Sequence, residues 1–251
     1  MPDSPSVRIS RRTLLSSVGI AIVATATSAS ARSLSGALPW QAFSADPPDM
    51  VKSVGWTYFK PEEARAIEAI VDRLIPADDL SIGGKDAGCA VYIDRQLAGD
   101  FGDSARLYMK GPFKPGTPTQ GYQKDETPAM RYRAGLAALD AWVKQNKDGK
   151  SFAELSPEDQ DALLKDMEAG KVELPNGVDA KAFFTLVLGN TMEGFFADPI
   201  YGGNRDMVSW RMLGFPGARY DYRDHVSKHN QPYPLPPVSI AGAPEWMGKK
   251  G

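Results

Sequence analysis

The densest group of side chains that could do chemistry lies in residues 198–224, where carboxylates and guanidinium groups alternate. The carboxylates are Asp198, Asp206, Asp221 and Asp224, and the arginines among them are Arg205, Arg211, Arg219 and Arg223. A pair of carboxyl groups can hydrolyse a bond when one of them has a raised pKa. Adjacent arginines act in the opposite direction, because they lower the pKa of a carboxyl group. The alternation therefore favours structural ion pairs, and a hydrolytic site is the less favoured interpretation.

The only histidines, His225 and His229, are four residues apart. On a helix they would share one face and could hold a metal ion. They lie at the edge of a Pro-rich tail, "YRDHVSKHNQPYP", with no obvious third ligand, so a role at the surface or in anchoring the tail is favoured. The chain also has no Gly-x-Gly-x-x-Gly or Cys-x-x-Cys-His motif, and we expect no catalytic residue, metal or other cofactor in it.

The single cysteine, Cys89, cannot form a disulfide within the chain. It follows a Gly-rich stretch, "DLSIGGKDAG", which predicts a surface position at the first turn of a helix. Two interpretations stay open. Cys89 faces a cysteine of a partner chain, or its side chain points inward with Val91 or Ile93.

Residues 1–31 have the pattern of a signal peptide. Arg11 and Arg12 precede an apolar run from 14 to 26, and "ASA" at 29–31 is a plausible cleavage site. The arginine pair predicts twin-arginine export to the periplasm, a route for cargo that is already folded. A transmembrane anchor is the weaker alternative, because the run is short and contains Ser and Thr. We expect no membrane span after leader removal.

The rest of the chain is predicted to be all-α. Residues 32–55 are expected to be a linker or arm, and residues 56–251 a single helical domain with long Pro/Gly-rich loops and an extended C-terminal tail. Helices are predicted near residues 61–75, 87–97, 128–146, 157–169 and 179–196 from apolar periodicity, from Pro at first helical positions and from capping residues. No alternating strand pattern of any length is present. The nearly balanced charge indicates neither nucleic acid nor an anionic membrane surface as a partner.

The segment "EGFFADPIYGGNRDMVSWRMLGFPGARYDYRD", with "HNQPYPLPPVSI" after it, resembles the small subunit of gluconate 2-dehydrogenase, the subunit 3 family. The stretches "RLIPADD", "YIDRQL", "GPFKPGTPTQGYQ" and "FAELSPEDQDALL" resemble the same family in order, so the resemblance covers essentially the whole mature chain. Related small subunits of glucose, sorbitol, fructose and 2-ketogluconate dehydrogenases share the general plan, so the resemblance points to the family and leaves these substrates as alternatives to gluconate.

The resemblance implies a complex of three subunits. A large flavoprotein subunit oxidises the substrate with FAD. A multihaem cytochrome c subunit takes the electrons and passes them to ubiquinone, and it also anchors the complex at the membrane. The small subunit carries no redox centre; it supports folding and export of the large subunit, which has no leader of its own. A free-standing periplasmic hydrolase or binding protein is the alternative from another class.

Given this resemblance, the stretch around the Gly-Gly pair is interpreted as a docking surface. The glycines permit close backbone approach, Asn204 suits a turn, and aromatic and Arg side chains are enriched in interface hot spots. The predicted interface residues are Cys89, Asp198, Tyr201, Gly202, Gly203, Asn204, Arg205, Asp206, Trp210, Arg219 and Tyr220. The alternative is that the aromatic residues fill the chain's own core.

Overall fold

The computed structural model describes residues 50–219 and 221–241. The predictions for the signal peptide with Arg11 and Arg12, for the first part of the linker and for Tyr220 lie outside the described residues.

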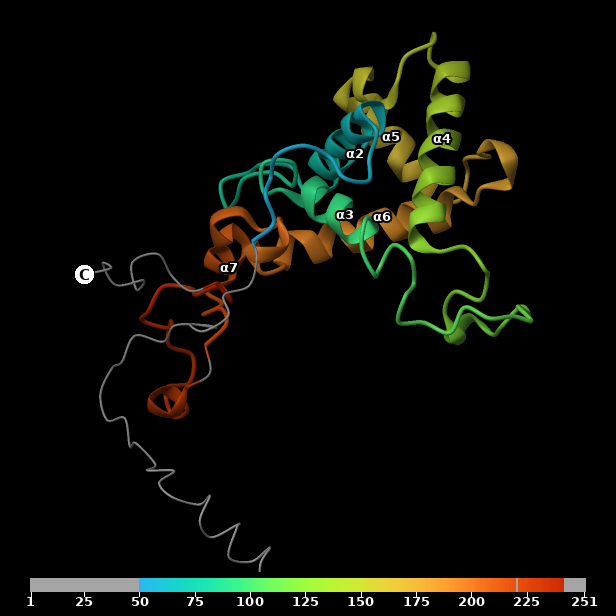
Figure 1. Ribbon diagram of the computed structural model, residues 1–251. Coiled ribbons are helices and arrows are strands. Elements are labelled where there is room, and N and C mark those ends of the chain that lie inside the picture. Colours follow the sequence, from blue (N-terminus) through green and yellow to red (C-terminus); the bar gives the residue numbers. More distant parts are fainter. Residues whose placement is uncertain (1–49, 220, 242–251) are drawn as a thin grey trace, which may run out of the picture. The chain divides into compact units, whose positions relative to one another are not determined.

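The described residues form an all-α fold, as predicted (Figure 1). The helices are α2 (Pro61–Leu74), α3 (Cys89–Leu97), α4 (Pro128–Asn146), α5 (Pro157–Glu168), α6 (Ala180–Phe196) and α7 (Val208–Leu213), with short 3-10 turns between them. Within this part of the chain, β pairing is limited to two isolated bridges, Glu173 with Asp179 and Gly217 with Val238. None of the described helices has the length and apolar character needed to cross a bilayer.

Helix starts follow the capping chemistry in the sequence. In α5, Ser156 Oγ accepts a hydrogen bond from the Asp159 N–H at 3.2 Å, and Pro157 occupies the first helical position. In α6, Asp179 accepts from the Ala182 N–H at 2.9 Å. Each cap satisfies an N–H group that has no partner within its helix. The predicted boundaries of these helices are therefore close to the observed ones.

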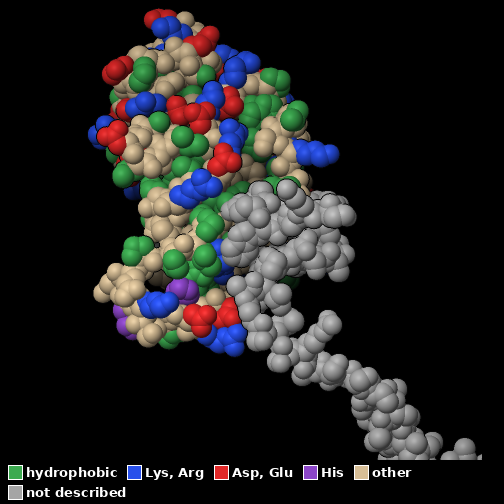
Figure 2. Space-filling view, turned by 90° about the vertical axis from the view of Figure 1, so that its left-hand side faces the viewer, with side chains coloured by type: hydrophobic (Ala, Val, Ile, Leu, Met, Phe, Trp, Pro, Cys, Tyr) green, Lys and Arg blue, Asp and Glu red, His purple; other side chains and the backbone are tan. Residues whose placement is uncertain are grey.

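The core forms where α6 packs against α2, α3, α4 and α5. Helix α6 is apolar nearly all round, which suits a helix covered on several sides. A buried hydrogen bond joins it to α4, from the Tyr132 hydroxyl to Asn190 Oδ1 at 2.9 Å. The outer surface is mixed in charge, and Figure 2 shows acidic and basic side chains interspersed on one face.

The segment that precedes α2 is tied to α3 by a buried carboxylate. Asp94 is fully buried and accepts hydrogen bonds from the backbone N–H groups of Thr57, Tyr58 and Phe59 at 2.9, 3.0 and 2.8 Å. It also pairs with Arg95, whose guanidinium donates to the carbonyls of residues 52, 54 and 55. The last residues of the predicted arm thus lie on the helical unit.

Candidate functional site

The chain beyond α6 caps the end of that helix with side chains. The last carbonyls of a helix have no partner within it. Here the Phe196 carbonyl accepts a hydrogen bond from Trp210 Nε1, and the Ala197 carbonyl accepts one from Asn204 Nδ2, both at 2.9 Å. These two side chains therefore fix residues 198–210 against the end of α6.

Asn204 is also the buried anchor of its own turn. Its φ of 45° lies in the left-handed region, which Asn tolerates better than most residues. Its Oδ1 accepts hydrogen bonds from the Ser209 N–H at 2.9 Å and from Ser209 Oγ at 2.8 Å. Its left-handed backbone confirms the predicted role of Asn204 in a turn. Its side chain is fully buried, so the prediction that it lies on a docking surface is wrong.

The Gly-Gly pair allows close approach within the chain. Gly202 has a φ of 93°, and its carbonyl oxygen would lie 2.5 Å from a Cβ on Gly88 at the start of α3. A Cβ on Gly203 would lie 2.9 Å from the Gly194 carbonyl carbon, too close to be accommodated. The Arg205 N–H donates to the Ala87 carbonyl at 3.0 Å. Backbone contacts thus lock residues 202–205 against both α3 and α6.

Asp198 joins the end of α6 to the C-terminal tail. It is buried, and its oxygens accept hydrogen bonds from the Ile200 N–H at 3.0 Å, Ser239 Oγ at 2.9 Å and the Ile240 N–H at 2.7 Å. Its carboxylate is thus turned into the chain's own tail, which contradicts the surface position predicted for it and gives no support to a hydrolytic role.

The expected array of Asp–Arg ion pairs forms only in part. Asp221 and Arg223 make a two-pronged pair at 2.9 and 2.6 Å, and the hydrogen bond from the guanidinium lowers the pKa of Asp221 to about 2. Within the described residues, Asp206 and Asp224 make no ion pair. Arg219 donates to the Pro236 carbonyl at 2.6 Å and lies 5.4 Å from the Tyr233 ring, so it holds the tail.

Trp210 belongs to the interior as well. It is only 7% exposed and packs edge-on against Phe215 with ring centroids 5.1 Å apart. Its predicted place on the docking surface is therefore wrong, because its indole N–H is used to cap α6.

What remains at the surface of this segment is a set of exposed aromatic, apolar and basic side chains. We call it the α7 surface and define it as Tyr201, Arg205, Arg211, Met212, Leu213 and Phe215. Leu213 is 62% exposed and Phe215 is 45% exposed. Tyr201 and Arg205 were predicted interface residues, and Gly202 and Asp206 lie beside them, half-buried and exposed respectively. Met212 and Leu213 were not singled out from the sequence. They are exposed because α7 is short and buries Trp210 on one face, which leaves the other faces of the helix to solvent.

Comparison with known protein families gives one match, to the family described as gluconate 2-dehydrogenase subunit 3, over residues 61–217. The match covers more than half of the chain and includes α2 to α7. The chain belongs to the gluconate 2-dehydrogenase subunit 3 family. It is therefore a subunit of a multi-subunit dehydrogenase complex. No curated protein and no solved structure matches the chain.

Cys89 lies in the hydrophobic core of the chain. Its side chain is fully buried, and desolvation raises the pKa of the thiol to about 12. The predicted surface position is wrong because the preceding Gly-rich stretch packs onto α2. Gly84 N–H donates to the Ile75 carbonyl at 2.7 Å, and the Cys89 N–H donates to Gly84. The geometry supports the interpretation of Cys89 as an inward-pointing core residue.

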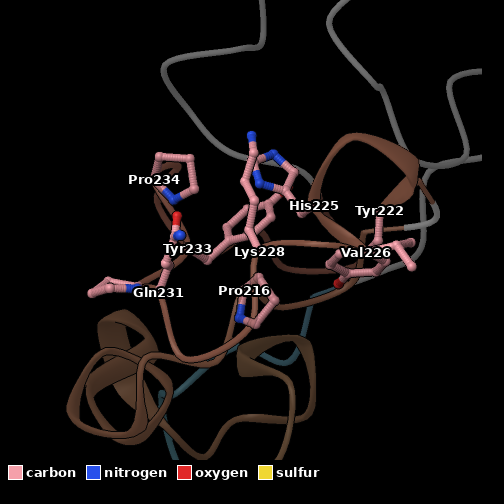
Figure 3. A pocket seen from close by; sticks show the side chains of 9 residues that line it. Pro216, Tyr222, His225, Val226, Lys228, Gln231, Tyr233 and Pro234 are labelled. Carbon is pink, nitrogen blue, oxygen red and sulfur yellow. The ribbon is translucent and has the colours of Figure 1, made fainter.

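The C-terminal tail forms a second candidate site, a cavity of about 460 Å³ (Figure 3). His225 and Tyr233 pack against each other in its lining with ring centroids 4.7 Å apart, and Lys228 lies beside them. His229 is exposed, and the described part of the chain contains no group of three potential metal ligands. Of the two histidines, His225 contributes aromatic lining to this cavity, which lies almost entirely beyond the region that the family match covers.

Proposed function

We propose that this chain is the non-catalytic small subunit of a periplasmic, membrane-associated gluconate 2-dehydrogenase complex. In this proposal it binds a large FAD-containing subunit that has no leader, supports its folding and carries it through the twin-arginine route. A multihaem cytochrome c subunit receives the electrons. The choice among gluconate and related sugars or polyols then rests with the large subunit, where the flavin lies.

The observation that carries the proposal is the contrast within residues 198–215. Asp198, Asn204 and Trp210 are fully used by the chain's own hydrogen bonds, yet the segment they fix presents Leu213 and Phe215 to solvent. Met, Arg and aromatic side chains are the types enriched at protein interfaces. A rigid segment that exposes such side chains suits docking, because little conformational entropy is lost on binding.

The docking role is tested by a double substitution, Arg205→Glu with Leu213→Glu, in the complete complex. Both side chains are exposed, so the thermal midpoint of the chain should stay within about 2 °C. Loss of two interface anchors should weaken co-purification of the flavoprotein by about 30-fold or more. Leu80→Glu is the matched control, because Leu80 is also exposed but lies in the loop before α3. Undiminished co-purification would exclude the α7 surface as the docking site.

A further inference from the structure

A second group of exposed apolar side chains lies far from α7 in sequence, in the long connection between α3 and α4. Figure 1 draws this connection as a green loop, and its regular structure is one short turn, Pro118–Gln120. Within it, residues 106–114, "RLYMKGPFK", are nearly all exposed, and we call them the basic loop. Leu107 is 67% exposed, Tyr108 82% and Phe113 42%.

The same residues carry a local positive charge that the balanced overall composition conceals. Arg106, Lys110 and Lys114 lie in the loop, and no acidic residue occurs from 104 to 124. Arg106 approaches Asp100 at 3.6 Å, but both side chains are highly exposed, so this pair adds little. Lys110 and Lys114 make no ion pair with any residue that the structure describes.

We propose that the basic loop is a peripheral membrane anchor that binds the surface of an anionic bilayer. Leu107, Tyr108 and Phe113 would enter the boundary between headgroups and acyl chains, which suits amphipathic aromatic side chains. The cations of the loop would contact the anionic lipid headgroups. The irregular backbone remains at headgroup depth, where water can satisfy its polar groups.

Lysine content distinguishes this loop from the α7 surface. Protein interfaces are depleted in Lys and enriched in Arg and Met. The α7 surface contains Arg205, Arg211 and Met212, whereas two of the three cations in the basic loop are lysines. A cavity of about 590 Å³ at the base of the loop reaches Tyr201, which makes a protein segment the competing occupant. The exposed lysines favour the bilayer, because a lysine ammonium stays hydrated at the headgroups.

The test places a fluorophore on the loop of the full-length chain. Tyr108→Cys is labelled with an environment-sensitive dye, and Cys89 does not compete because it is buried. Phosphatidylcholine vesicles with and without phosphatidylglycerol are then added. We expect a blue shift with the anionic vesicles only, which added salt reduces. Lys150→Cys, at an exposed position after α4, serves as the control label and should not shift.

Affinity is compared between two variants that lose the same charge. Lys110→Ala with Lys114→Ala should weaken the binding reported at residue 108 by about 30-fold, from the usual contribution of a basic residue near an anionic surface. Lys165→Ala with Lys181→Ala, exposed residues on α5 and α6, should have no effect. All variants carry the same leader, so a difference in binding among them does not come from the leader. The absence of a shift at residue 108, or an equal shift at residue 150, overturns the proposal. Loss of flavoprotein co-purification without any vesicle response overturns it too, in favour of a protein partner.

Discussion

Gly203 and Gly194 touch backbone to backbone, which brings the segment after α6 against the last turn of that helix. A side chain on Gly203 would collide with the Gly194 carbonyl, and neither backbone can yield without moving α6 or the Asn204 turn. The same segment meets α3 through Gly202 and Gly88. The α7 surface is therefore positioned by close backbone contacts that leave no room for a side chain at these glycines.

Gly203→Ala should destabilise the chain by about 3 kcal/mol, at the upper end of the cost of overpacking, because the clash is with backbone. For a unit of this size that corresponds to a fall in the thermal midpoint of about 6–12 °C. Gly189→Ala is the control, since a Cβ there meets nothing within 4 Å and alanine favours the helix. If the two variants unfold at the same temperature, the close approach of Gly203 and Gly194 is not a constraint.

Trp210→Ala should act on the fold first and on assembly only through the fold. The substitution removes a buried indole and its hydrogen bond to the Phe196 carbonyl, which predicts a loss of about 3–5 kcal/mol in the free energy of unfolding. Urea denaturation of the chain measures it. Arg205→Ala, at an exposed position, should change this free energy by less than about 0.5 kcal/mol. A stable Trp210→Ala chain that fails to bind the flavoprotein would return Trp210 to the interface.

The sequence predicts the helices of this fold better than it predicts which side chains they expose. Proline at the first position and capping by Ser156 or Asp179 are local signals, so α5 and α6 are predicted well. Helix α7 is six residues long and too short for a periodic pattern. The buried positions of Asn204 and Trp210 depend on carbonyls at the end of α6, and no local pattern encodes such a contact.

The same limit explains the wrong prediction for the Gly-rich stretch before α3. Glycines suggested an exposed loop, but a Cβ on Gly84 would lie 2.5 Å from the Val71 carbonyl oxygen, so this glycine allows packing against α2. Composition alone cannot distinguish a glycine in a flexible loop from a glycine that lets two backbone segments pack closely together.

Asp94→Ala should detach the segment before α2 from α3. The substitution leaves the N–H groups of Thr57, Tyr58 and Phe59 without their acceptor and leaves Arg95 without its carboxylate, at a cost of about 3 kcal/mol or more. Asp140→Ala, which breaks an exposed pair with Lys144, should cost at most about 0.5 kcal/mol. Urea denaturation compares the two. Equal losses would show that the Asp94 cluster adds no more than a surface pair.

Export of the dehydrogenase should depend on the leader of this chain. Arg11→Lys with Arg12→Lys should abolish dehydrogenase activity in the periplasmic and membrane fractions, because the flavoprotein is proposed to travel with this chain. The matched control is Arg8→Lys, which lies outside the arginine pair. Normal activity outside the cytoplasm with the double variant would mean that the flavoprotein is exported independently.

Cys89 should behave as a core residue and not as a bridge to a partner. With a thiol pKa of about 12, the thiolate fraction at pH 8 is about 10⁻⁴ in the folded chain. It rises to about a quarter in the unfolded chain, where the pKa is near 8.5. Thiol labelling at pH 8 should therefore be slow in buffer and fast in urea. The purified complex should show this subunit at its own mass on electrophoresis with or without reductant, and Cys89→Ser should not change that pattern. A band of higher mass that disappears with reductant, and with Cys89→Ser, would show that the core opens at α3 to form a disulfide with a partner.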